Sequence, residues 1–296
     1  MAMLPTMLTD YARLMRPHHW VKNGFVAVPL FLSPHLLGLD AITTVLMGVL
    51  AFCLVSSAVY VLNDIADCET DRLHPVKCNR PLAAGRVKLP ACWILFAALV
   101  GIAALIATVL PFRFGIVLGA YLGLNLAYSF RLKRVAILDI MSIALGFVLR
   151  VLAGIELIGS NPTVWIILIT WLVALFLALA KRRDDIVRQM DAQHRQSLAG
   201  YNKPFLDAAL SVVLGATLVS YMICMTDVGV MTRLGSRHLY LTVLFVTGGA
   251  LRYLQITFVE ERSGSPTDIL LRDRFLQSMV GGWLLTMAAL LYFHLG

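Results

Sequence analysis

The chain contains little charge and few acidic residues. Of its 296 residues, 14% are charged and 59% are hydrophobic, and the mean hydropathy is +0.80. Because an average soluble domain is only about 45–50% apolar, this composition excludes an ordinary soluble protein. The apolar stretches recur along the chain and leave no soluble segment over. They predict a single all-α domain, residues 1–296, of packed membrane-spanning helices.

Other absences narrow the chemistry. The five cysteines show no C-x-x-C spacing, which argues against a zinc site or a disulfide framework. There is no Ser-His-Asp or Cys-His set of the kind used in nucleophilic catalysis. The net charge of +8 comes from basic residues in short loops between apolar segments, not from one basic stripe. We therefore expect no nucleic-acid partner.

The apolar pattern predicts nine membrane spans. The first, residues 24–38, is short, because 15 residues of helix rise about 22 Å against a hydrocarbon core of roughly 30 Å. Pro29 and Pro34 also break it. No small-residue cleavage pattern follows it, so we do not interpret it as a signal peptide. The other expected spans are 40–62, 92–111, 114–130, 136–157, 162–180, 205–226, 238–258 and 276–294.

The basic residues are distributed unevenly between the two sides of the predicted bundle. Of the 25 lysines and arginines, 20 fall in the N-terminal segment and in alternate loops on the same side. Because positive residues concentrate in cytoplasmic loops, this predicts a cytoplasmic N-terminus and an external C-terminus. The longest loops, 63–91 and 181–204, are both on the predicted cytoplasmic side. Loops of that length between helices are more often functional than idle.

A polar motif directly follows the second expected span. Asn63, Asp64, Asp67 and Asp71 fall within an arc of about 100° on a helix, whereas Glu69 points the opposite way. Carboxylates on one face repel each other unless a cation lies between them, and such oxygen ligands favour Mg²⁺. We therefore expect a magnesium–diphosphate site here. The alternative is a solvated helix end with local ion pairs.

Basic residues follow these carboxylates. They include Lys77 and Arg80, which could neutralise the remaining oxygens of a diphosphate. The loop ends in Arg80-Pro-Leu-Ala-Ala-Gly85, and its Pro and Gly favour a turn that would fold the basic residues back over the acids.

Further candidates lie elsewhere in the chain. The sixth expected span ends in Lys181, Arg182, Arg183, Asp184, Asp185 and Arg188. This end could bind anions, or it could be a helix terminus with internal ion pairs and membrane anchors. Lys133, in a short loop after Tyr128, is a phosphate candidate, and Lys22 is either a phosphate contact or an interfacial anchor. Arg150 lies within a span, where an uncompensated charge is costly, so it should face a polar cavity or pair with a buried acid.

Several stretches together resemble the UbiA superfamily of membrane prenyltransferases, and more closely its decaprenyl-phosphate phosphoribosyltransferase branch. They are Asn63-Asp64-x-x-Asp67-x-x-x-Asp71, RPHHWVKN (16–23), YSFRLK (128–133), AKRRDD (180–185) and LLRDR (270–274). The resemblance implies a UbiA-like fold, with about nine helices around a central polar cavity that opens to the lipid. It also implies Mg²⁺ held at two polar motifs.

The resemblance also implies a reaction, in which 5-phosphoribose passes from phosphoribosyl pyrophosphate to a polyprenyl phosphate and pyrophosphate is released. Asn63 and the three aspartates would hold Mg²⁺ and the donor pyrophosphate, and Lys77 and Arg80 would contact phosphates. Lys181 and Arg182 match the second motif, but Asp185 stands where glutamate is expected. The acceptor phosphate would be held by Lys22, Lys133 or Lys181, with Tyr128 and Arg150 completing the substrate-binding set.

Two alternative functions remain open at this point. The same aspartates could bind a polyprenyl diphosphate for transfer to an aromatic acceptor, because the first motif does not distinguish the two donors. A membrane transporter or lipid scaffold could instead use Arg150 and the acidic helix end to line a pathway. The sequence also leaves open whether identical chains assemble into a homo-oligomer.

Overall fold

The computed structural model describes residues 3–161, 163–187, 196–261 and 266–292, and every regular element within them is a helix. Seven of the nine expected spans coincide with helical segments to within four residues at each end. The sixth also coincides with a helix, which runs seven residues beyond the expected end. Seven helices in the described residues are long and apolar enough to cross a membrane. The predicted count of nine is therefore not confirmed. The chain divides into two compact units.

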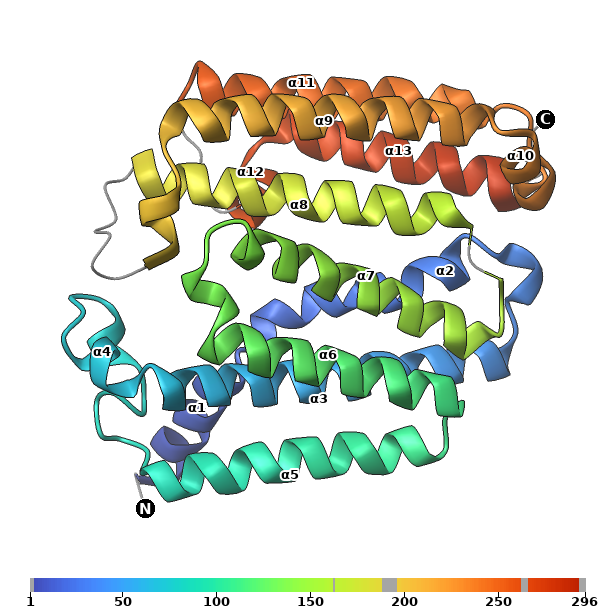
Figure 1. The fold of residues 1–296 in the computed structure, drawn as a ribbon. Helices are drawn as coiled ribbons and strands as arrows, with labels where there is room; N and C mark the ends of the chain where they lie inside the picture. Colours follow the sequence, from blue (N-terminus) through green and yellow to red (C-terminus); the bar gives the residue numbers. More distant parts are fainter. Residues whose placement is uncertain (1–2, 162, 188–195, 262–265, 293–296) are drawn as a thin grey trace. The chain divides into compact units, whose positions relative to one another are not determined.

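The first unit comprises Met1–Phe31, Leu36–Ser142 and Leu149–Asn161. Its α-helices are α1 (Met3–Met15), α2 (Val28–Phe31), α3 (Leu39–Ala66), α4 (Cys68–Arg72), α5 (Leu89–Thr108), α6 (Phe112–Phe130) and, apart from residues 143–148, α7 (Leu138–Ile158). Short 3-10 helices connect them, namely η1 (Pro17–Ala27), η3 (Lys77–Asn79) and η4 (Leu132–Arg134). Figure 1 shows α5 running alongside α3.

Helix α3 is the internal helix of this unit. In its most apolar 18-residue window 67% of the residues are buried, against 17% for α5. Phe52 of α3 packs against Phe114 and Tyr121 of α6, with ring centroids 6.0 and 5.1 Å apart. A second buried cluster joins α3 to Leu14 of α1 and to Leu82 in the loop that follows α4. Packing on several sides thus fixes the end of α3.

The first expected span differs from a membrane helix. It is divided between η1, α2 and η2 (Pro34–Leu36), and a proline is the first or second residue of each piece. Proline lacks the backbone N–H and clashes with the preceding turn, so it starts a helix readily but does not continue one. The segment instead packs closely on α7. A Cβ atom on Gly154 would collide with the carbonyl oxygen of Val26 and would lie 3.0 Å from the ring of Pro29.

The second unit comprises Leu32–His35, Ile143–Val148 and Pro162–Gly296. Its helices are α8 (Val164–Val187), η6 (Gln196–Gly200), α9 (Lys203–Thr226), α10 (Val228–Leu234), η7 (Leu239–Thr242), α11 (Val243–Phe258), α12 (Pro266–Arg272) and α13 (Arg274–Tyr292). Helix α8 packs on α9, and α11 packs on α13. The buried hydroxyl of Tyr221 joins three elements, because it lies 2.7 Å from Thr242 Oγ1 and accepts a hydrogen bond of 2.6 Å from Trp283 Nε1.

Gly154→Ala should destabilise the protein by about 1–3 kcal/mol, because the added methyl group meets backbone that cannot move aside. Gly101→Ala is the matched control, since nothing lies within 4 Å of a Cβ atom at that helical position. Thermal unfolding of the detergent-purified variants measures both. A melting temperature lowered equally in the two variants would contradict the close packing of the proline segment on α7.

Candidate active site

The predicted carboxylates lie where α3 ends. Helix α3 stops at Ala66, and Asp67 caps it with non-helical backbone angles (φ −99°, ψ 4°) before α4 begins at Cys68. The motif is therefore not one continuous helix. The interruption is small, since the amide of Asp67 still donates to the carbonyl of Asn63 (2.9 Å) and that of Asp71 donates to the carbonyl of Asp67 (2.8 Å). Successive turns thus still stack, as the helical spacing of the motif predicts.

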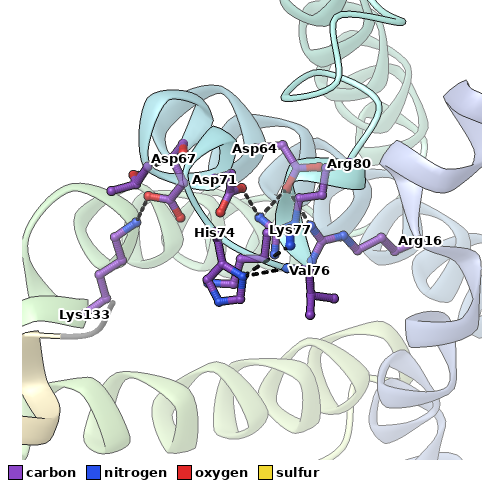
Figure 2. A network of polar contacts seen from close by, with 10 residues as sticks. Arg16, Asp64, Asp67, Asp71, His74, Val76, Lys77, Arg80 and Lys133 are labelled. Atoms are coloured by element: carbon purple, nitrogen blue, oxygen red, sulfur yellow. Dashed lines mark hydrogen bonds and ion pairs between the residues drawn. The ribbon is translucent and has the colours of Figure 1, made fainter. Parts of the chain in front are cut away.

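Each carboxylate of the motif contacts a basic side chain (Figure 2). Asp64, which is 2% exposed, accepts hydrogen bonds on Oδ1 from Arg16 Nη2 and from Arg80 Nη1, the latter at 3.1 Å. The same Arg80 nitrogen donates to Oδ2 of the buried Asp71. The third acid, Asp67, accepts from Lys133 Nζ and has a more exposed side chain. Three cations from three separate elements thus neutralise the three acids.

The turn that follows the motif positions Arg80. Gly85 has a positive φ of 72°, a conformation that favours glycine, and the amide of Arg86 donates to the carbonyl of Pro81 at 2.9 Å. The Arg86 side chain then binds both carboxylate oxygens of Asp10 in α1 at 3.1 and 3.2 Å. The predicted turn is therefore present. It brings Arg80 back over the acids, as the Pro and Gly residues of this loop indicate.

Arg16 is a site residue that our sequence reasoning did not select. It lies between α1 and η1 in a left-handed conformation (φ 50°, ψ 58°), and its guanidinium is 5.0 Å from the centre of the Tyr60 ring. The following Pro17 disfavours a right-handed helical conformation here. Arg16 and Asp64 are 48 residues apart. A helix end before proline was visible in the sequence, but the partner of the arginine was not.

The predicted substrate residues Lys22, Asn63, Lys77 and Tyr128 are all half-buried. Asn63 directly precedes Asp64, Lys77 begins η3, and Tyr128 lies near the end of α6. Their roles stay predictions.

Arg150 belongs to a separate polar cluster in the interior of the first unit. It is 7% exposed and donates from Nε to Asn23 Oδ1 (2.9 Å) and from Nη2 to the Tyr121 hydroxyl (2.8 Å). Asn23 is fully buried, and its amide nitrogen donates to Ser56 Oγ at 3.1 Å. This cluster joins η1, α3, α6 and α7 through polar contacts. It thus provides polar surroundings for a charge that hydrocarbon alone would not tolerate.

The second predicted motif lies at the end of α8, in the second unit. Lys181 is exposed, whereas Arg182 and Arg183 are fully buried. Arg182 Nη1 donates to Asp185 Oδ2 at 3.1 Å, which is the internal ion pair expected of a helix terminus. Arg183 Nε donates to Asp207 Oδ1 on α9. Asp184 is also buried, and Arg188 lies outside the described residues.

The donor atoms suit Mg²⁺, which binds oxygen ligands and commonly uses one or two carboxylates together with phosphate oxygens of a substrate. In this structure Asp64 and Asp71 converge on a single positive group, the Arg80 Nη1 nitrogen. No three His, Cys, Asp or Glu side chains of the described ranges gather as a preformed metal site. The residues therefore suit a metal ion that would be held by two carboxylates, near the point where Arg80 binds them, with its remaining ligands supplied by a substrate.

Comparisons with known proteins show which sequences and folds this chain is similar to. Residues 25–291 match the family model described as the UbiA prenyltransferase family. A decaprenyl-phosphate phosphoribosyltransferase of Mycobacterium tuberculosis is 30% identical over 97% of this chain and 96% of its own length. The uncharacterized protein y4nM of Sinorhizobium fredii is 40% identical over 60% of this chain, and this match spans only 35% of that protein.

A solved structure supports the fold. It is a UbiA homologue from Archaeoglobus fulgidus bound to GPP and Mg²⁺, and it superposes with a TM-score of 0.73 over 95% of this chain and 99% of that chain, at 17% identity. At this identity the similarity concerns the fold alone.

Asn23→Ala should lower the free energy of unfolding by about 2–4 kcal/mol, because it leaves the buried Arg150 guanidinium without the Asn23 acceptor. Asn125→Ala is the control, since that half-buried amide donates to a carbonyl of its own helix, Tyr121 O at 2.8 Å. We expect less than about 1 kcal/mol for the control. Unfolding of the two variants in the same detergent is the measurement, and equal losses would contradict the linking role of Asn23.

Proposed function

Because this chain belongs to the UbiA prenyltransferase family and is an integral membrane transferase, we propose that it transfers 5-phosphoribose from phosphoribosyl pyrophosphate to a polyprenyl phosphate. Pyrophosphate is the second product. The observation that carries the proposal is the similarity to a decaprenyl-phosphate phosphoribosyltransferase along nearly the whole of both chains. The cluster of three acids and three cations at the end of α3 supports it, since it suits a metal-bound diphosphate.

In this proposal the carboxylates and cations act on the departing pyrophosphate. Asn63, Asp64, Asp67 and Asp71 would hold Mg²⁺, which when bound neutralises the negative charge that develops on the leaving group. Arg80 and Lys77 bind its outer oxygens through charge-assisted hydrogen bonds. Cations aimed at charge that develops in the transition state lower the barrier because they need not reorganise during the reaction.

The attacking group needs no activation by the protein. The bond from the anomeric carbon to the pyrophosphate oxygen breaks, and an oxygen of the lipid phosphate forms the new bond to that carbon. This oxygen is already anionic at neutral pH, so neither a strong general base nor a protein nucleophile is required. Lys22, Lys133 and Lys181 are our candidates to hold the acceptor phosphate, and Tyr128 and Arg150 our candidates for further substrate contacts.

We assign two different roles to the residues of the second motif. Lys181 is exposed, and we retain it in the proposed site. Arg182 and Asp185 bind each other, which favours a structural role for this pair at the end of α8. The shorter side chain of Asp185, where the family pattern has glutamate, points the same way.

We also propose that the site faces the cytoplasm and that residues 1–296 form a single transferase domain. The support for the cytoplasmic orientation is the unequal distribution of Lys and Arg between the two sides of the predicted bundle. A soluble, multiply charged donor would then reach the site from the compartment in which it is made, while the lipid acceptor arrives from the bilayer.

A product assay tests the proposal. Purified protein, supplied with Mg²⁺, labelled phosphoribosyl pyrophosphate and decaprenyl phosphate, should form a labelled lipid and an equal amount of pyrophosphate. Geranyl diphosphate with 4-hydroxybenzoate should give no prenylated product. The reverse pattern would support prenyl transfer to an aromatic acceptor instead. Binding of both donors without pyrophosphate release, by protein shown to be folded, would contradict either transferase.

A further inference from the structure

The nitrogen of Arg80 that contacts Asp64 also contacts Asp71. Nη1 lies 3.1 Å from Asp64 Oδ1 and also bonds Asp71 Oδ2, so one positively charged group bridges the two most buried acids of the site. Figure 2 shows the guanidinium between these two side chains. A divalent ion bound by the same two oxygens would have to lie at nearly the same point. Arg80 and such an ion therefore compete for one position.

We propose that Arg80 makes this acid site selective for a metal–diphosphate pair over a bare divalent ion. While no diphosphate is present, the guanidinium neutralises Asp64 and Asp71. With the pair bound, Asp64 and Asp71 would hold the metal, and the Arg80 guanidinium would donate to oxygens of the diphosphate. The proposal rests on the proposed function only in that the donor of that reaction carries a diphosphate.

The reason for selectivity is the fate of the displaced guanidinium. A bare ion that takes the two carboxylates leaves Arg80, whose side chain is 26% exposed, close to a divalent charge of the same sign and without its two anionic partners. A diphosphate supplies replacement partners at the same moment, because its oxygens accept short, charge-assisted and bidentate hydrogen bonds from arginine. Only the pair therefore replaces every interaction that its binding breaks.

The exchange can take place by side-chain motion alone. The backbone at Arg80 is held by hydrogen bonds on both sides, from its own amide to the Lys77 carbonyl (2.9 Å) and from the Ala84 amide to its carbonyl (2.8 Å). Arg86 additionally ties this turn to Asp10 and to the carbonyl of Asn79. The long Arg80 side chain can thus swing from carboxylate to phosphate while the turn keeps its place.

The other two cations are arranged differently. Arg16 contacts Asp64 and, within the described part of the chain, does not bridge to a second acid; its guanidinium is also held over the Tyr60 ring. Lys133 contacts the more exposed Asp67. Neither cation occupies the point between Asp64 and Asp71, so the structure assigns the competition with the metal to Arg80.

Binding of Mn²⁺, followed by electron paramagnetic resonance on detergent-purified protein, tests the inference without any turnover. Arg80→Met should bind Mn²⁺ alone at least tenfold more tightly than the wild type, because the competing cation is gone. The same variant should bind Mn²⁺ together with inorganic pyrophosphate at least tenfold more weakly. Arg72→Met is the matched control. This arginine, in the neighbouring helix α4, forms an ion pair with the exposed Glu69, which lies outside the motif, so both affinities should stay unchanged.

The expected changes in the two affinities are opposite in sign, which distinguishes the proposed role of Arg80 from a phosphate contact alone and from a structural role. A phosphate contact alone would weaken the second affinity and leave the first unchanged, and a structural role would weaken both, so either result overturns the proposal. If Arg80→Met does not give a cooperative melting transition, Arg80→Lys replaces it. A single ammonium group bridges two acids less well, so Mn²⁺ alone should again bind more tightly, and unchanged or weaker binding overturns the proposal.

The outcome is independent of the product assay. The first measurement uses metal alone, so it can succeed even if the phosphoribosyl donor is not the substrate. A wild type that forms the lipid product while Arg80→Met fails to bind Mn²⁺ more tightly would remove this inference and leave the proposed function standing.

Discussion

The structure of the first unit depends on neutralising three carboxylates at the end of a buried membrane helix. Two of them, Asp64 and Asp71, are almost inaccessible to solvent, and buried charge is tolerated only when it is paired and hydrogen-bonded. The neutralising cations come from the segment before η1, from the turn after η3 and from η4. Through these ion pairs, the charge balance at the end of α3 connects the surrounding elements to one another.

The same constraint explains the local geometry around the acids. The prolines before and within the first expected span keep that segment from forming a long helix. Gly154 allows the broken segment to approach α7 closely. Because of this arrangement Arg16 leaves the end of α1 at a point from which it reaches Asp64, and Gly85 with Arg86 fixes the turn that carries Arg80. Packing of ordinary apolar residues thus sets the positions of the charged ones.

Features that depend on local sequence could be predicted, whereas contacts between distant parts of the chain could not. Apolar length alone located α5 and α9 to within a few residues, since a membrane span must satisfy its backbone internally. The shared helix face of the acids and the turn at Gly85 were predicted because both depend on local sequence patterns. Arg16 was missed because its partner lies 48 residues away and only the packing of η1 on α3 brings them together. The burial of Arg182 was missed for a similar reason, because a basic helix end reads as a solvated membrane anchor until its neighbours are known.

The central claim is that the acids paired with the cations, and not simply any acidic residue of this loop, hold the metal and the leaving group. The most direct measurement compares pyrophosphate release by Asp71→Asn and Glu69→Gln, two substitutions that each remove one charge from the short helix α4. Asp71 is buried against Arg80, whereas the side chain of Glu69 is 85% exposed. We predict a loss of roughly 100-fold or more for Asp71→Asn and a rate within about twofold of the wild type for Glu69→Gln. Comparable rates for the two variants would contradict the account.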